Sequence, residues 1–145
     1  MNAKEYLSQA YFLDRKINYK LRQTVSLRER AKKGTGTMYA QRVSGTDKHS
    51  PMEDAITNLI DLEHEINSDI DKLVDLKREM ITVINTVNQS VYRLLLELRY
   101  LRYKSWEEIA NQMRYSLQTI HCVHVEALTA VKLDIIQRAR SEAAG

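Results

Sequence analysis

The chain has 145 residues, with four glycines, one proline and one cysteine, a formal net charge of +3 and a pI of about 9.0. This length suits one domain, or one domain with an appendage. No apolar run approaches the roughly 18 residues that a membrane helix needs, and a single cysteine cannot form an internal disulfide. We therefore expect a cytoplasmic protein without membrane contact, and the scarcity of glycine and proline predicts an all-α fold.

The first predicted helix covers residues 4–32. Its inward positions recur at spacings of three and four residues and are Ala10, Leu13, Ile17, Leu21, Thr24 and Leu27. We expect the helix to end at Gly34, because glycine readily adopts the left-handed conformation of a helix cap. Residues 34–51 hold three of the four glycines and the only proline, which predicts a flexible loop.

The second predicted helix covers residues 52–88 and follows a heptad pattern. Eight of its ten heptad positions are apolar, and the ten are Ile56, Leu59, Glu63, Ile66, Ile70, Leu73, Lys77, Met80, Ile84 and Val87. Residues 1–50 carry 11 basic and 4 acidic residues, whereas residues 51–88 carry 3 and 9. Residues 1–88 are therefore predicted to fold as an antiparallel coiled-coil hairpin. Further apolar residues widen its seam, which predicts homodimerisation through the hairpin.

Residues 89–145 are predicted to form a separate three-helix bundle. The first helix, residues 90–103, would bury Val91, Leu94, Leu95, Leu98 and Leu101. The second begins at the capping box Ser105-Trp106-Glu107-Glu108 and would bury Ile109, Ala110 and Met113. After a turn, Ser116 caps a third helix of residues 117–139, with Ile120 and Val123 inward and His124 at the edge. A short helix, a turn and a capped second helix are typical of a helix-turn-helix.

In a helix-turn-helix, the early outward positions of the second helix enter the major groove of DNA. Here they are Leu117, Gln118, Thr119, His121 and Cys122. Glutamine can pair with adenine, and threonine or leucine can contact a thymine methyl group. This face carries no lysine or arginine, so phosphate contacts are expected from residues around it, namely Arg99, Arg102, Lys104, Ser105, Arg114, Tyr115 and Ser116. The uncharged face leaves open a second interpretation, a module that binds another protein.

Residues 94–128, "LLLELRYLRYKSWEEIANQMRYSLQTIHCVHVEAL", resemble the DNA-binding region 4 of the sigma-70 family of bacterial sigma factors. The matching positions are Leu98, Arg99, Tyr100, Ser105, Glu107, Glu108, Ile109, Ala110, Ser116, Ile120, Ala127 and Leu128. Arg114 occupies the turn position where that family usually has glycine, which we expect to be accommodated by a negative φ or a rearranged turn.

The whole chain is similar to small sigma-like proteins of phages and integrative elements in Gram-positive bacteria, relatives of ArpU-type transcriptional regulators. The similarity rests on "MNAKEYL", "SGTDK" and "ITNLIDLEHEINSDIDKLVDLKREMI". It implies a non-enzymatic regulator that binds double-stranded DNA, controls mobile-element genes and associates with the nucleoid of a bacterial host. RNA polymerase is a further candidate partner, and the alternative is that the module binds the polymerase or another transcription factor without reading DNA.

The stretch His121-Cys122-Val123-His124 is the other candidate for chemistry. On a helix the two histidines can converge, but Cys122 points about 100° away, so the stretch supplies two ligands where a zinc site takes four. No glycine-rich or strand-turn context would activate Cys122 as a nucleophile. The acidic residues between positions 61 and 75 lie on one continuous helix and lack a calcium-binding loop. We therefore predict no enzyme activity, metal or cofactor.

Overall fold

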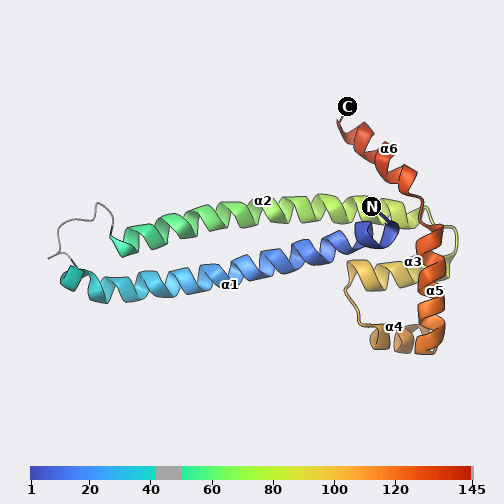
Figure 1. Cartoon of the computed structure of the whole chain (residues 1–145), viewed down its shortest axis with the longest axis horizontal. Coiled ribbons are helices and arrows are strands. Elements are labelled where there is room, and N and C mark those ends of the chain that lie inside the picture. Colours follow the sequence, from blue (N-terminus) through green and yellow to red (C-terminus); the bar gives the residue numbers. More distant parts are fainter. Residues whose placement is uncertain (42–49, 145) are drawn as a thin grey trace. The chain divides into compact units, whose positions relative to one another are not determined.

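The computed structural model describes residues 1–41 and 50–144, and every regular element in these residues is helical (Figure 1). The predicted all-α class is confirmed. The elements are α1 (Ala3–Gln41), α2 (Pro51–Asn85), α3 (Ser90–Leu96), the π-helical turn η2 (Glu97–Leu101), α4 (Trp106–Met113), α5 (Leu117–Ala130) and α6 (Leu133–Ala144). In the part of the chain that the structure describes, none of these helices is long and apolar enough to span a bilayer.

Helix α1 is longer than its predicted span. It begins at a reciprocal cap, in which the Glu5 amide donates to Asn2 Oδ1 at 2.8 Å and the Asn2 amide donates to Glu5 Oε2 at 3.2 Å. The predicted end at Gly34 is wrong, because α1 continues to Gln41. A glycine inside a helix costs only about 1 kcal/mol relative to alanine, which weakens a helix without necessarily ending it. The remainder of the predicted loop, residues 42–49, lies outside the described residues.

The chain divides into two units, which are described separately below. Unit 1 comprises Met1–Leu13 and Leu73–Gly145, and unit 2 comprises Asp14–Lys72. Both long helices contribute to both units. The predicted boundary between residues 88 and 89 falls inside unit 1, whose core combines side chains from both sides of that position.

In unit 2, α1 and α2 lie side by side and run in opposite directions (Figure 1). Ion pairs join them: Lys20 Nζ lies 2.6 Å from Asp69 Oδ2 and 3.3 Å from Glu65 Oε2, and Arg28 pairs with Glu63 at 3.0 Å. The side chain of Asp69 is only 6% exposed, so its pair with Lys20 lies in the interface between the helices. The hydrogen bond from Lys20 holds the pKa of Asp69 below its usual value.

Six of the eight apolar positions in the predicted heptad seam of α2 face inward. Leu59 and Leu73 are partly buried, and Ile66, Met80, Ile84 and Val87 are buried, as predicted. At the other two the prediction is wrong by one residue: Ile56 and Ile70 are 39% and 40% exposed, whereas Ala55 and Asp69 are 8% and 4% exposed. On α1, Leu21 is 44% exposed, and its neighbour Lys20 turns inward instead. The spacing of apolar residues alone does not predict this register, because the inward face of each helix includes one charged side chain. These two side chains, Lys20 and Asp69, pair with each other.

Unit 1 holds the main hydrophobic core. The start of α1 and the end of α2 pack against α3, η2, α4 and α5. Tyr6 links these parts, because its hydroxyl donates to Glu79 at 3.0 Å and Glu79 also pairs with Arg140 of α6 at 3.5 Å. The fully buried side chains of this core include Tyr6, Leu7, Met80, Val83, Leu95, Leu96, Leu98, Ile109 and Ile120.

Two predictions about the C-terminal helices need correction. Val91 and Leu94 are 36% and 41% exposed, while Leu96 and Tyr100 are buried. Val91, Leu94 and Leu96 lie in α3, so their exposure reflects the face that α3 turns to the core; only Tyr100 lies in the π-type turn η2. A π-type turn holds more residues than an α-helical turn and so rotates the inward face. The predicted helix of residues 117–139 is two helices, since α5 ends at Ala130 and Val131 adopts an extended backbone that places its side chain in the core.

Candidate functional site

Helix α4 begins at the predicted capping box. Ser105 Oγ accepts a hydrogen bond from the amide of Glu108 at 3.2 Å, and Glu108 Oε2 accepts one from the amide of Ser105 at 3.2 Å. Two backbone donors that the helix itself leaves unpaired are thereby satisfied. On its inner face α4 buries Ile109 and Ala110, as predicted, and Ala110 allows close approach because its side chain is a single methyl group.

The turn between α4 and α5 is held by Arg114 in the left-handed conformation, with φ 60° and ψ 40°. The expectation of a negative φ or a rearranged turn is wrong: Arg114 adopts the conformation that glycine takes most easily. The turn is closed by the amide of Tyr115, which donates to the Ala110 carbonyl at 3.1 Å. Because Cβ crowds the backbone in this conformation, an arginine there costs about 1 kcal/mol.

Ser116 caps α5. Its Oγ accepts from the Thr119 amide at 3.1 Å and lies 2.8 Å from Thr119 Oγ1. Two of the residues predicted to contact DNA therefore also fix the start of the helix that carries them.

The N-terminal half of α5 presents one exposed face. Ile120, His124 and Ala127 are buried and attach the helix to unit 1. All five residues predicted to contact bases are exposed, and Leu117 is 43% exposed. They are Leu117, Gln118, Thr119, His121 and Cys122, and we call them the α5 face. Val125, which is 63% exposed, lies further along the same helix and was not predicted.

The basic residues predicted to hold phosphates differ in how available they are. Arg99 lies 4.3 Å from the centre of the Trp106 ring and donates to the Lys104 carbonyl at 3.0 Å, so its guanidinium is already engaged. Arg102 pairs with Glu97 at 3.4 Å, on the surface. Arg114 is exposed and makes no ion pair with a described residue. Arg114 is therefore the most available cation beside the α5 face.

Next to the α5 face lies an aromatic cluster that the sequence did not predict, and two of its members, Tyr100 and His124, are buried. His124 Nε2 lies 2.6 Å from the Tyr100 hydroxyl, and the Trp106 ring lies 4.6 Å from that of His124 and 5.3 Å from that of His121. Burial lowers the pKa of His124 to about 4, helped by the positive charges of Lys4 and Arg99. Burial also raises the pKa of Tyr100 to about 12. Both groups are consequently neutral near pH 7.

His124 was predicted at the edge of its helix but is only 8% exposed. The helical spacing of Ile120, His124 and Ala127 is the signal that could have shown it, because the three residues share one face. The stretch from His121 to His124 is thus divided between the surface and the core. Among the described residues, no three histidine, cysteine, aspartate or glutamate side chains lie together so that they could hold a metal ion.

A protein-family model matches residues 32–132, more than half of the chain, and its description is "Protein of unknown function (DUF1492)". The match includes α2, α3, α4 and α5, and with them the α5 face. No curated protein matches the chain, and no solved structure matches it.

Proposed function

The chain belongs to the DUF1492 family, and we propose that it is a DNA-binding transcription regulator whose helix α5 reads duplex DNA. The observation that carries the proposal is the exposed, uncharged α5 face at the start of a capped helix, preceded by the short α4 and a tight turn. A helix-turn-helix places a helix of this kind in the major groove, with its first residues against the base edges. The resemblance to sigma region 4 supports the same interpretation.

Each residue of the α5 face has a defined role in this proposal. Gln118 can form a bidentate pair with adenine, whereas Leu117 and Thr119 can contact a thymine methyl group. His121 and Cys122 offer a ring nitrogen and a thiol to adjacent base edges. These contacts distinguish sequences, but they contribute little of the charge neutralisation that holds a protein on DNA.

Phosphate contacts supply the remaining affinity. Arg114 is the first candidate because it is exposed and lies in the turn, and Tyr115 next to it presents a side chain that is 41% exposed. Arg102 can exchange Glu97 for a phosphate at little cost, since a surface ion pair contributes only about 0–1 kcal/mol. The half-buried Lys104 and the capping serines, Ser105 and Ser116, complete the predicted set, with Arg99 in a positioning role against Trp106.

We further propose that α1 and α2 form a coiled-coil hairpin that serves as the assembly platform of the regulator. By the same resemblance, the regulated genes belong to a phage or an integrative element, and the protein works on the bacterial nucleoid. These statements rest on the resemblance and on the acidic and basic character of the two long helices.

A second candidate function has its own supporting observation. Tyr115, Leu117 and Val125 are 41%, 43% and 63% exposed, so the surface around the α5 face is partly apolar and carries no cation on α5 itself. Aromatic and aliphatic anchors of this kind are typical of protein interfaces. In this alternative, α5 binds RNA polymerase or another transcription factor and does not read DNA.

The test begins with selection of binding sites from a randomised duplex library by the full-length protein. Binding of the enriched duplex is then measured at several salt concentrations. We expect Gln118→Ala to weaken the specific complex by about 1–3 kcal/mol, which is roughly fivefold to more than a hundredfold, with little effect on random DNA. The matched control is Gln137→Ala, which removes an exposed glutamine from α6 and should bind like the wild type.

Arg114→Ala should instead weaken binding to all duplexes alike and reduce the slope of log affinity against log salt by about 1. If no sequence is enriched and Gln118→Ala binds DNA like the wild type, the DNA-reading proposal is wrong. In that case, retention of purified RNA polymerase by the wild type, lost in Leu117→Asp, would favour the alternative.

A further inference from the structure

Unit 2 buries few apolar side chains for its length. Among its described residues, the buried positions are Ile17, Thr24, Ala55, Ile66 and Asp69, and two of these are polar. Helices are stable when their apolar stripes are covered by another layer, and two helices provide only one interface.

One outward surface of unit 2 is apolar. On α1, Leu21 and Val25 are 44% and 54% exposed and lie one helical turn apart. On α2, Ile56, Ile60 and Ile70 are 39%, 49% and 40% exposed and follow heptad spacing. We call these five residues the apolar face of unit 2.

The two halves of the apolar face lie on the same side of the helix pair. Arg28 follows Leu21 by seven residues and Val25 by three, so it shares their side of α1. By the same spacing, Glu63 shares the side of α2 that carries Ile56, Ile60 and Ile70. Arg28 pairs with Glu63 at 3.0 Å, and this bond can form only if both sides face the same way.

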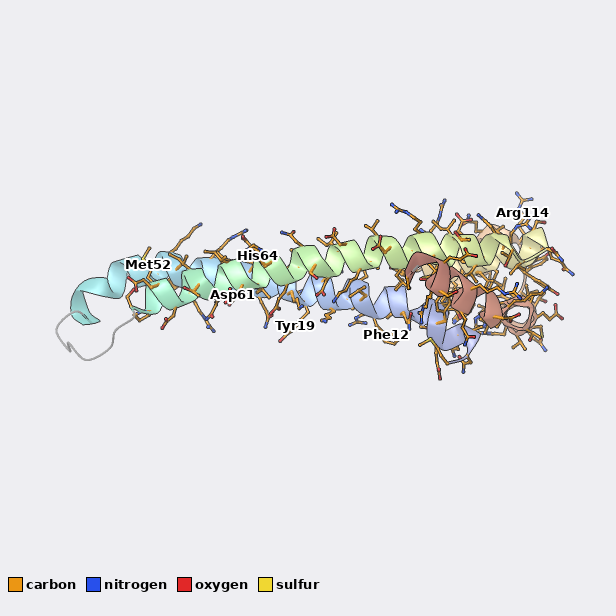
Figure 2. The ribbon with its side chains drawn as sticks, turned by 90° about the horizontal axis from the view of Figure 1, so that it is seen from above. Phe12, Tyr19, Met52, Asp61, His64 and Arg114 are labelled. Atoms are coloured by element: carbon orange, nitrogen blue, oxygen red, sulfur yellow. The ribbon has the colours of Figure 1, made fainter. Side chains whose placement is uncertain are left out.

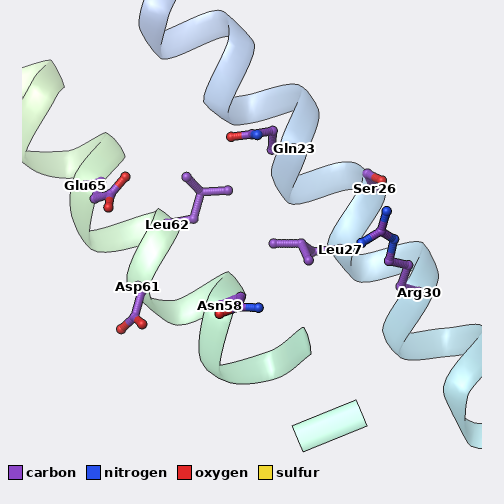
Figure 3. Close-up of a pocket in the computed structure, with 8 residues that line it drawn as sticks. All are labelled: Gln23, Ser26, Leu27, Arg30, Asn58, Asp61, Leu62 and Glu65. Carbon is purple, nitrogen blue, oxygen red and sulfur yellow. The ribbon is translucent and has the colours of Figure 1, made fainter. Parts of the chain in front are cut away.

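The opposite side of unit 2 has a different character. A polar groove runs there between the helices, lined by Gln23 and Arg30 of α1 and by Asp61 and Glu65 of α2. Leu27 and Leu62 point toward each other at its floor (Figure 3). The apolar side chains are therefore concentrated on one side of the pair, as in a helical layer that is covered on that side only.

We propose that a second copy of this chain covers the apolar face of unit 2, so that the two copies form a four-helix bundle. Charge complementarity favours this occupant. The outer flanks of the apolar face carry Arg22 on α1 and Asp71 on α2, whereas Arg28 and Glu63 already pair with each other within one chain. A two-fold axis parallel to the helices sets each α1 against the α2 of the other copy, so that basic flanks meet acidic flanks and all neighbouring helices are antiparallel. The proposal does not depend on DNA binding.

The first test is the mass of the full-length protein by sedimentation equilibrium over a range of concentrations. The wild type should be dimeric, and Ile60→Glu with Ile70→Glu should raise the dimer dissociation constant by at least roughly tenfold, because two carboxylates would be buried in the interface. The matched control is Tyr19→Glu. Tyr19 is 61% exposed and projects from α1 on another side, two residues before Leu21 (Figure 2), so this variant should stay dimeric.

A second test does not depend on the folding of the acidic variant. In a Cys122→Ser background, single-cysteine chains carrying Leu21→Cys or Asn67→Cys are mixed and oxidised. These positions lie at matching levels of the proposed bundle, so the mixture should yield a disulfide-linked pair of unlike chains. A mixture of Ser26→Cys and Asp61→Cys, which lie on the groove side, should not.

A wild-type chain that remains monomeric at all concentrations overturns the proposal. So does a dimer whose dissociation constant is unchanged by the two glutamates, or a disulfide that forms only between the positions on the groove side.

Discussion

Acidification below about pH 6.5 should destabilise unit 1, because its core requires a neutral histidine. His124 is 8% exposed, and its Nε2 lies 2.6 Å from the Tyr100 hydroxyl. Burial lowers its pKa from the usual 6.5 to about 4, and the neighbouring cations Lys4 and Arg99 act in the same direction. An unfolded chain loses these surroundings, so its histidine binds a proton at a higher pH than the folded chain does.

The direction and the size of the effect follow from this difference. Because the folded pKa is lower than the unfolded one, the contribution of His124 is fully present above about pH 6.5 and is lost as the pH falls toward about 4. At about 1.4 kcal/mol for each pH unit between the two values, the total loss is about 3 kcal/mol. Asp69 also has a lowered pKa, but its contribution is lost only as the pH falls below its usual value of 3.8.

The assay is urea unfolding of the full-length protein at several values between about pH 7 and pH 4, followed by circular dichroism. The matched variant is His124→Gln, which keeps a hydrogen-bond acceptor near Tyr100 but does not titrate. It should be less stable than the wild type near pH 7, and its free energy of unfolding should change much less over the same range. If His124→Gln loses as much stability on acidification as the wild type does, the reasoning from a buried neutral histidine is refuted.

Two further predictions concern residues that depart from sequence rules. Arg114→Gly should raise the free energy of unfolding by up to about 1 kcal/mol, because glycine adopts the left-handed conformation without crowding; a lower urea midpoint would contradict this. Asp69→Ala should lower the melting temperature far more than Asp61→Ala, because it leaves Lys20 without its 2.6 Å partner in the helix interface. Replacing both members, Lys20→Met with Asp69→Leu, should recover that loss, and a double variant no more stable than Asp69→Ala would count against the account.

The features that the sequence predicted well are those set by neighbouring residues. The all-α class follows from the scarcity of glycine and proline, and the starts of α4 and α5 follow from Ser105 and Ser116. A cap is a contact between residues three apart, so its residues are visible in the sequence itself. For the same reason the exposure of the α5 face was correctly predicted once the start of its helix was known. Its role in DNA binding remains a proposal.

The features that the sequence missed depend on contacts between distant residues. Asp69 lies inward because Lys20, 49 positions away in the chain, neutralises it. Tyr11 and Tyr103 are far apart in the sequence, yet their rings lie 5.7 Å apart, and the Tyr103 hydroxyl donates to the Ala10 carbonyl at 3.3 Å. These contacts help to hold Tyr103 at a φ of 57°, which no local rule predicts for a tyrosine.

By itself, the sequence determined that the chain is helical, where the short helices α4 and α5 begin, and which residues of α5 face outward. These properties depend on backbone propensity, capping and a period of 3.6 residues, all of which act within a few positions. Only the tertiary structure decided the register of the long helices, the burial of His124 against Tyr100, and the concentration of apolar residues on one side of unit 2. The free energy of each of these depends on what lies across an interface, because a charge or an imidazole can be buried only where a distant partner compensates for the lost water.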